Sequence, residues 1–412
     1  MDITKLTFLI IYYVIDILVF AYLLYYIITG IFAFLGKKKI FKYRPKKKIA
    51  VVIPARNEEN VIAILIDSLK NQNYPKKLYD IFVVPNNCTD NTKDISIESG
   101  AKIIDINFEI KNKGDVLKYS FGYLNSNYDY DAYCIFDADN IVHPDFLRNM
   151  NNALCSGFNV AQGYRDSKNP RDTWISSCYA LFYYIQNLFF NQARMNMGWS
   201  SSINGTGFMV AKSVIQKYGF NTKTVTEDIE FSALCALNNE KIAFVKEAVT
   251  YDEQPLGFIT SIKQRMRWSF GTIECLKLYF ITLITNAFKN KVPQSFDMAI
   301  FFFAPIFQLI TFFIVIITIV FNIFNFDNSI LINNIYNSKM ISLILGVVGS
   351  IFISLLVVIF DKKKLKNIFK GMFTLSIFML TWVPINIICI LKKDFYWEPI
   401  KHTRKLDINS VI

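Results

Sequence analysis

Long apolar runs at both ends of this 412-residue chain, with a more polar stretch between them, most strongly constrain its fold. The first run covers about residues 6–35. A membrane-spanning helix needs about 20 apolar residues, so we expect one long or tilted span there. Three further runs follow at about 296–321, 340–360 and 368–391. The sequence therefore predicts a soluble middle domain inserted between membrane helices.

Basic residues beside these runs indicate which side of the membrane the middle domain occupies. Residues 37–48 are rich in lysine and arginine, and such a block next to a span is typical of the cytoplasmic side. The loop 361–366 is also basic. We therefore expect a multi-pass plasma-membrane protein with its N-terminus outside and its middle domain in the cytosol. Four crossings would leave the basic tail outside, against the same rule, unless the last run enters the membrane without crossing it and bends at Pro384.

The net charge of +12 comes largely from residues next to the apolar runs. We interpret it as attraction to the lipid bilayer and to phosphates, not as nucleic-acid binding. The seven cysteines include no C-x-x-C pair, and the two histidines are His143 and His402. A zinc site is therefore not expected, and reduced thiols fit a cytosolic domain.

Short apolar runs alternate with helical patterns in the first half of the middle domain. Such alternation predicts βαβ units and a parallel sheet covered by helices on both faces. In sheets of this kind, ligands bind at the carboxyl ends of the strands. The predicted strands are 49–54, 81–84, 102–106 and 132–136, and the predicted helices between them are 58–72 and 115–124.

Asp137 and Asp139 directly follow the last of these strands. Two carboxylates at i and i+2 in a loop can hold a hard cation such as Mg²⁺ or Mn²⁺, with a diphosphate completing the coordination. Carboxylates at strand ends are also common turn formers, so the pair alone is a weak indication. Its position at the carboxyl end of a parallel strand strengthens the metal interpretation.

A second acidic motif, Thr226-Glu227-Asp228, precedes a helical run at 229–237. Ordinary helix capping explains a threonine followed by acidic residues in the first turn. A general base held at the start of a helix is the functional alternative, and the two are compatible because a cap also positions a carboxylate.

A third motif, Gln264-Arg265-Met266-Arg267-Trp268, lies on a predicted helix. On its own it fits any basic amphipathic helix resting on a membrane, with Trp268 at the interface.

In order and spacing, these motifs resemble those of family 2 glycosyltransferases of the membrane-bound subgroup, such as the poly-N-acetylglucosamine, hyaluronan and cellulose synthases. The resemblance covers about residues 48–279 and includes the segments 51–58, Lys113-Gly114 and 204–207. It implies an α/β GT-A domain, the nucleotide-diphospho-sugar transferase fold, inserted between transmembrane α-helices. The implied divisions are a transmembrane helix at 1–36, the catalytic domain at 37–255, interfacial amphipathic helices at 256–293, transmembrane helices at 294–392 and a tail at 393–412.

The resemblance also implies roles for individual residues. Asp228 would be the catalytic base, and Asp139, with Asp137, would bind Mg²⁺ or Mn²⁺. Many relatives carry an acidic pair where this chain has Pro85-Asn86, but an amide oxygen can still accept a hydrogen bond from the uracil N3–H group. The nucleotide-sugar would contact Pro54, Arg56, Glu58, Asn86, Asp90, Lys113 and Asp137, and the acceptor would contact Gly205, Thr206, Gly207, Glu227, Gln264, Arg267 and Trp268.

The expected function is inverting, metal-dependent transfer of a sugar from a UDP-sugar to a membrane-associated glycan or lipid acceptor. We expect the product to be a β-linked cell-surface polysaccharide, because the complete motif set and the large apolar C-terminal section favour a polymer synthase. The alternative is a glycolipid made on diacylglycerol or a polyprenyl carrier, since the small number of apolar runs argues against a self-sufficient channel unless a partner subunit or homo-oligomer completes it. A transporter or inactive scaffold is disfavoured because the ionisable motifs lie outside the apolar runs. The sequence leaves the donor sugar, processivity and oligomeric state open.

Overall fold

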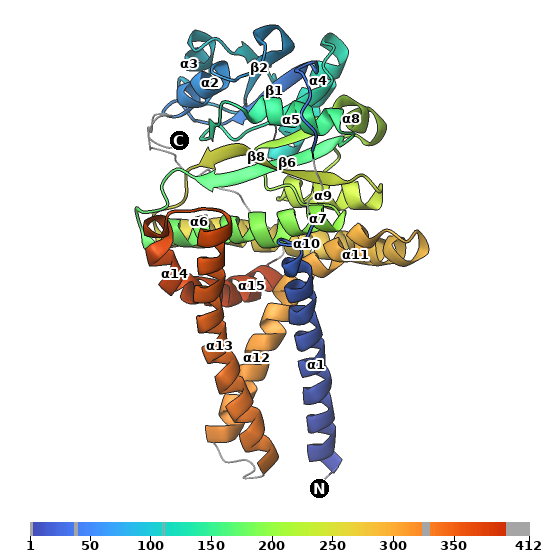
Figure 1. Cartoon of the computed structure of the whole chain (residues 1–412), viewed down its shortest axis with the longest axis vertical. Coiled ribbons are helices and arrows are strands. Elements are labelled where there is room, and N and C mark those ends of the chain that lie inside the picture. Colours follow the sequence, from blue (N-terminus) through green and yellow to red (C-terminus); the bar gives the residue numbers. More distant parts are fainter. Residues whose placement is uncertain (1–2, 37–39, 109, 111, 324–329, 393–412) are drawn as a thin grey trace.

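The computed structural model describes residues 3–36, 40–108, 110, 112–323 and 330–392. An α/β domain lies above a layer of helices that run across the molecule, and long helices extend away from this layer on its other side (Figure 1). The α/β domain thus meets the long helices through an intermediate helical layer.

The α/β domain contains an eight-stranded sheet with the strand order β3-β2-β1-β4-β7-β6-β8-β5. The half formed by β3, β2, β1 and β4 is parallel, as the sequence predicts. The second half is mixed, because β7 is antiparallel to both β4 and β6. The strands are β1 Ile49–Ala55, β2 Tyr79–Pro85, β3 Lys102–Ile103, β4 Ala132–Ile135, β5 Ile141–Val142, β6 Val160–Ser167, β7 Phe208–Ala211 and β8 Ile242–Asp252.

Strand β1 lies inside the sheet and is buried on both faces. Ile49, Val51 and Ile53 belong to one apolar cluster, while Ala50 and Val52 belong to the cluster on the opposite face. A continuous apolar run is what a strand covered on both faces requires. The surrounding helices are α2 Ile62–Lys70, η1 Lys76–Leu78, α3 Thr92–Glu98, α4 Lys113–Asn127, α5 Phe146–Cys155, α8 Lys212–Tyr218 and α9 Glu227–Leu237.

The intermediate layer is built around α6 and α10. Helix α6 begins with a capping box, in which the Thr173 side chain accepts from the Ser176 backbone N–H and the Ser176 side chain accepts from the Thr173 backbone N–H. Helix α14 packs along α6, where the Gly371 backbone N–H donates to Ser177 Oγ at 2.9 Å. The elements of the layer are α6 Trp174–Ile185, the π-helical η2 Gln186–Gln192, α7 Ala193–Met197, α10 Phe258–Lys289, α11 Pro293–Phe302, α14 Leu365–Leu380 and α15 Trp382–Leu391.

The long helices are α1 Ile3–Ile31, α12 Ala304–Ile323 and α13 Ile330–Phe360. By length and composition, Ile10–Ile31 and Leu365–Leu391 can each cross a membrane, and within the described residues a third candidate arises if α11 and α12, bent by 47° at their junction, form one span. A further apolar helix, Ile344–Phe360, is shorter. Helices of this kind are typical of a membrane-associated protein.

The last apolar run is broken between α14 and α15. The break lies at Thr381, three residues before Pro384, whose missing N–H removes one helical hydrogen bond. The fully buried Arg265 guanidinium of α10 donates to the Phe378 carbonyl at 3.0 Å and to Thr381 Oγ1 at 2.6 Å. In Figure 1, α15 lies across the direction of α1, α12 and α13, and whether the last run crosses the membrane stays a prediction.

The loop between α13 and α14 contacts the α/β domain. The buried Asp361 side chain accepts from Lys246 Nζ at 2.6 Å and from the Tyr164 hydroxyl at 3.0 Å. Lys363 pairs with Asp166 at 2.6 Å. This basic loop therefore lies on the same side of the helical layer as the α/β domain, while the predicted tail at 393–412 falls outside the described residues.

A buried ion pair joins α1, α7 and α11. The Arg194 guanidinium donates to both carboxylate oxygens of Asp297, at 3.1 Å and 2.9 Å, and the Tyr25 hydroxyl donates to the same carboxylate at 2.5 Å. The Arg194 side chain is 0% and the Asp297 side chain 4% exposed. Removing one partner of such a pair leaves the other charge buried without compensation.

We predict that Arg194→Met lowers the free energy of unfolding by about 3–5 kcal/mol. The matched control is Lys93→Met, which removes the Lys93–Asp105 pair, whose side chains are 46% and 57% exposed, and is expected to cost less than about 1 kcal/mol. Chemical denaturation of the detergent-solubilised protein measures both. Equal, small effects of the two substitutions would contradict the importance of the buried pair.

Candidate active site

Asp137 and Asp139 lie at the carboxyl end of β4 and have different surroundings. The Asp137 carboxylate is partly exposed and accepts from Lys113 Nζ at 2.5 Å. The Asp139 side chain is buried, and its oxygens accept from Asn140 Nδ2 at 3.1 Å and from the Glu253 backbone N–H at 3.2 Å. The structure therefore places the first carboxylate beside a cation and holds the second from two directions.

Lys113 is the point where the predicted motifs meet. Besides Asp137, its ammonium donates to the Gly205 carbonyl at 2.7 Å and lies 3.5 Å from Glu227 Oε1. Burial alone would lower the pKa of Lys113, but the Asp137 and Glu227 carboxylates outweigh burial and raise it. Lys113 thus stays charged and joins the D-x-D loop, the 204–207 loop and the T-E-D motif.

Glu227 and Asp228 occupy the first turn of α9. Burial raises the pKa of both carboxyls, and the positive charges of Lys113 and Arg267 offset only part of that rise. Gly205, with φ +83°, lies directly against Asp228, because a Cβ atom at Gly205 would be 3.1 Å from Asp228 Oδ2. The glycine therefore serves both a left-handed turn and a close approach to the predicted base.

The first turn of α9 is not capped in the predicted way. Thr226 occupies the N-cap position, but its side chain forms no capping hydrogen bond. Its hydroxyl instead faces α10, where a Cβ atom at Gly271 would be only 2.1 Å from Thr226 Oγ1. Gly271, which the sequence analysis missed, therefore allows α10 to approach the T-E-D motif. Glu230 holds the preceding loop, accepting from the backbone N–H of Thr224 at 2.6 Å.

The motif on α10 points in two directions. Arg265 is turned toward α14 and α15, as described above, whereas the charge of Arg267 acts on the Glu227 and Asp228 carboxyls of α9. Gln264 Oε1 and Arg267 Nε are buried and have no hydrogen-bond partner within the described part of the chain. These two groups are therefore available to a ligand.

Trp268 belongs to an aromatic cluster between α6, α10 and α15. Its ring centroid lies 6.1 Å from that of Phe182 and 6.4 Å from that of Trp382, both stacked, and 5.7 Å from Tyr179. The structure thus gives Trp268 a packing role, and its predicted contact with an acceptor sugar stays a prediction.

The predicted nucleotide-binding residues lie at the ends of β1 and β2. Pro54 is in β1, and Arg56 and Glu58 follow it. Asn86 Nδ2 donates to the Ile110 carbonyl at 3.2 Å, which leaves Asn86 Oδ1 buried with no partner among the described residues. The predicted amide acceptor is therefore present.

Asp90 has a local structural role in the loop after β2. Its carboxylate accepts from the Thr92 hydroxyl at 2.5 Å and from the Glu59 backbone N–H at 3.2 Å. Burial would raise the pKa of Asp90, but these hydrogen bonds lower it. A contact of Asp90 with a nucleotide stays a prediction.

The arrangement fits a divalent metal only if the donor supplies ligands. Among the described residues, no group of three or more His, Cys, Asp or Glu side chains is placed to hold a metal ion. Asp137 and Asp139 offer two carboxylates, so the remaining ligands of Mg²⁺ or Mn²⁺ would be diphosphate and water oxygens, as is usual for Mg²⁺ with nucleotides. Thr206 supports the D-x-D loop, because its Oγ1 accepts from the Asp137 backbone N–H at 3.0 Å. Gly207, the last residue of the 204–207 segment, follows it in the chain.

The sequence analysis missed a buried ion pair beside the D-x-D loop. Arg165 of β6 donates to Asp252 Oδ2 of β8 through Nε at 2.8 Å and through Nη2 at 2.5 Å. Burial raises the pKa of Asp252 to about 6, with Arg165 opposing the rise and Asp139 adding to it. Nearby, the buried Lys168 donates to the Asp139 carbonyl. The sequence features that could have indicated this pair are a basic residue, Arg165, within a predominantly apolar segment and an acidic residue, Asp252, at the end of another.

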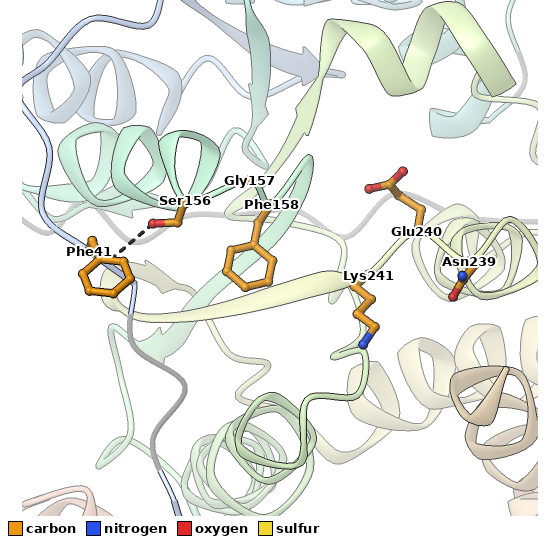
Figure 2. A pocket seen from close by; sticks show the side chains of 7 residues that line it. All are labelled: Phe41, Ser156, Gly157, Phe158, Asn239, Glu240 and Lys241. Carbon is orange, nitrogen blue, oxygen red and sulfur yellow. Dashed lines mark hydrogen bonds between the residues drawn. The ribbon is translucent and has the colours of Figure 1, made fainter.

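A hollow of about 460 Å³ lies at the amino-terminal ends of β6 and β8, away from the Arg165–Asp252 pair (Figure 2). Its polar side chains contact the protein itself: Ser156 Oγ accepts from the Phe41 backbone N–H at 3.2 Å, and Lys241 Nζ donates to the Gly198 carbonyl at 2.7 Å. It does not include the motif residues, and we do not assign it a role in the site.

The chain is similar in sequence to known glycosyltransferases. The chain is 29% identical over 274 residues to a probable glycosyltransferase, YdaM, of Bacillus subtilis, covering 62% of each protein. It is 24% identical over 261 residues to the beta-monoglucosyldiacylglycerol synthase of Nostoc sp., covering 61% of this chain and 54% of the relative. The matched region thus spans only about half to three fifths of these relatives.

A solved structure shares the fold. The mannosyltransferase PcManGT of Pyrobaculum calidifontis, solved with GDP-Man and Mn²⁺, superposes with a TM-score of 0.60 at 15% identity, covering 91% of this chain and 98% of that protein. The α/β domain therefore has the predicted GT-A fold.

The sequence profile of one family matches residues 45–271, more than half of the chain and all three motifs. This match, with the D-x-D and T-E-D motifs brought together at Lys113, shows that the chain belongs to the glycosyltransferase like family 2.

Proposed function

We propose that this protein transfers a sugar from a nucleotide-sugar to a membrane-associated acceptor, with inversion at the anomeric carbon. The contacts of Lys113 carry this proposal, because one ammonium contacts the Asp137 carboxylate, the Gly205 carbonyl and the Glu227 carboxylate. A donor-binding loop, an acceptor-side loop and the predicted base are thereby held at one place. Proximity of donor, acceptor and base is the main requirement of a group transfer.

The chemistry of Asn86 supports a uracil or guanine nucleotide as donor. The contact of Asn86 Nδ2 with the Ile110 carbonyl orients the amide so that its oxygen is the free acceptor. Uracil and guanine both present a ring N–H donor, whereas cytosine and adenine present an acceptor at the corresponding ring nitrogen. PcManGT, which was solved with GDP-Man and Mn²⁺, is a relative in fold that also supports a nucleoside diphosphate donor and a divalent metal.

Asp137 and Asp139 would hold Mg²⁺ or Mn²⁺, which would stabilise negative charge on the departing diphosphate. Lys113 remains beside Asp137 to neutralise further charge at the same place. As the acceptor oxygen forms its bond to the anomeric carbon, the bond to the diphosphate oxygen breaks and the nucleoside diphosphate leaves with the electron pair. The acceptor proton passes to the Asp228 carboxylate.

The position of the site favours a lipid acceptor. The T-E-D motif packs against α10, in the helical layer next to the long helices. Within the described residues, two or three helices qualify as membrane spans, few for a channel that threads a polymer. The similarity to a beta-monoglucosyldiacylglycerol synthase points the same way.

Polysaccharide synthesis is the second candidate, and the complete set of D-x-D, T-E-D and Q-x-x-R-W motifs favours it. This function would require a partner subunit or a homo-oligomer to complete a translocation path. In either case we propose a cytosolic α/β domain, because the basic loop after α13 and the domain lie on the same side of the helical layer.

Product analysis tests the proposal. Purified protein in vesicles with Mg²⁺ or Mn²⁺ would receive radiolabelled UDP-glucose, UDP-N-acetylglucosamine or GDP-mannose, with and without diacylglycerol or polyprenyl phosphate. We expect organic-extractable label that requires added lipid. A high-mass product sensitive to a matching glycanase would favour the polymer, and no turnover together with no nucleotide binding would refute the proposed function.

We predict that Asp228→Asn lowers transfer by about 10²–10⁴-fold while leaving the affinity for UDP in the presence of Mn²⁺ within about twofold, because only the general base is lost. Initial rates and calorimetry measure the two quantities. Asp129→Asn is the matched control, since Asp129 has a 90% exposed side chain paired with Lys212. Parallel loss of binding and transfer would argue against a base.

We also predict an acid limb in the pH dependence of kcat/KM. Asp228 must be deprotonated to accept a proton, and burial raises its pKa above the ordinary value of 3.8, so activity should fall as pH decreases through a midpoint above that value. Because Glu227 is adjacent and similarly shifted, the midpoint belongs to the pair. UDP affinity measured at each pH separates this effect from loss of donor binding. A midpoint at or below 3.8 would contradict the assignment.

A further inference from the structure

Tyr183, on α6, carries a buried hydroxyl without a hydrogen-bond partner in the described part of the molecule. Its side chain is only 3% exposed. One helical turn earlier, Tyr179 is also buried, but its hydroxyl donates to the Ser261 carbonyl at 3.2 Å. The two tyrosines therefore lie on the same face of α6, but only the Tyr179 hydroxyl has a hydrogen-bond partner among the described residues.

The ring of Tyr183 connects it to the site. The Arg165 guanidinium lies 4.0 Å from the Tyr183 ring centroid, and the Trp268 ring centroid lies 6.2 Å away. Arg165 Nη1 in turn donates to the Asn204 carbonyl at 2.7 Å. Tyr183 and Asn204 thus flank the same guanidinium.

Asn204 is the second unsatisfied group. It is 6% exposed, and neither its side-chain oxygen nor its nitrogen has a hydrogen-bond partner among the described residues. The next residue, Gly205, lies against the Asp228 carboxylate. Asn204 is therefore the chain neighbour of the residue that contacts the predicted base, and the Arg165 guanidinium connects Tyr183 to the same loop.

Buried polar groups without partners are rare, and each costs about 1–3 kcal/mol of stability. Here an amide nitrogen, an amide oxygen and a phenol remain unsatisfied on two residues that both contact the Arg165 guanidinium. Burial raises the pKa of Tyr183, and the Asp228 charge adds to this effect while Arg165 opposes it, so the phenol stays protonated and can donate. Together the three groups can pair with hydroxyls, which both donate and accept.

We propose that the Tyr183 hydroxyl and the Asn204 side-chain amide bind hydroxyl groups of the acceptor and hold the attacking hydroxyl against Asp228. This inference rests on the proposed glycosyl transfer. The ligand chemistry is an alcohol, which either a lipid headgroup or the end of a glycan can provide. Helix α6 belongs to the layer that faces the long helices, and this is the side from which a membrane-associated acceptor arrives.

Tyr183→Phe tests the proposal with the loss of one oxygen, and the ring that contacts Arg165 and Trp268 remains. We expect the KM for the acceptor to rise about tenfold, the size of one lost hydrogen bond, and a larger share of the donor to be hydrolysed without transfer. The dissociation constant for UDP with Mn²⁺ should stay within about twofold. The melting temperature should be unchanged or higher, because an unsatisfied group is removed.

Tyr179→Phe is the matched control. It removes a satisfied phenol and leaves the Ser261 carbonyl without that partner, so we expect a lower melting temperature and an unchanged acceptor KM. Diacylglycerol vesicles form one arm of the assay and soluble cello- and chito-oligosaccharides the other, and the arm in which Tyr183→Phe raises KM identifies the source of the alcohol.

Two outcomes would overturn this inference but not the proposed function. In the first, Tyr183→Phe has the same acceptor KM and the same share of hydrolysed donor as the wild type. In the second, Tyr183→Phe binds UDP more weakly and also has a lower melting temperature, as a purely structural role predicts. A wild-type protein that binds neither UDP nor GDP with Mn²⁺ would overturn the proposed function and this inference with it.

Discussion

The candidate site depends on a half-buried cation among carboxylates. The Lys113 ammonium is surrounded by the Asp137 carboxylate, the Glu227 carboxylate and a backbone carbonyl, and the buried Glu227 carboxylate in turn is compensated by Lys113. Removing either sign of charge would leave the other unpaired. An incoming diphosphate adds negative charge to this balance, so the binding of a divalent cation with the donor is the physically consistent way to restore it.

Helix α10 connects this charge balance to the membrane side of the molecule. On one side, Arg265 closes the carboxyl end of α14 through the Phe378 carbonyl, where the helix dipole favours a positive charge. On the other, Gly271 permits contact with Thr226, and the charge of Arg267 reaches Glu227. Helix α10 therefore contacts both α14 of the helical layer and the turn that carries the predicted base.

Local patterns predicted much of the fold and many of the site residues. The parallel strands, α4 and α9 follow from apolar periodicity, and the D-x-D and T-E-D motifs lie where strand ends and helix starts place them. Pairings between distant segments were not predictable, because no periodicity links Arg165 to Asp252 or Arg194 to Asp297. Helix α3 and the mixed half of the sheet were also missed, because a helix of seven residues carries little periodicity and the antiparallel pairing of β7 depends on tertiary contacts.

Several unsatisfied polar atoms lie in or near the motifs, although a stable fold would pair or exclude them. Asn86 Oδ1, Gln264 Oε1, Arg267 Nε and the Tyr183 hydroxyl are all buried without partners in the described chain. In the same domain, the buried Gln162 amide is paired at both ends, with the Asn204 backbone N–H and the Thr206 carbonyl. Buried amide atoms away from the motifs, such as Asn386 Oδ1, also lack partners among the described residues, so it is their position at the motifs that makes the first four groups candidates for contact with a ligand. Stability given up there is recovered only when ligands arrive, which makes binding energy available for orienting donor and acceptor.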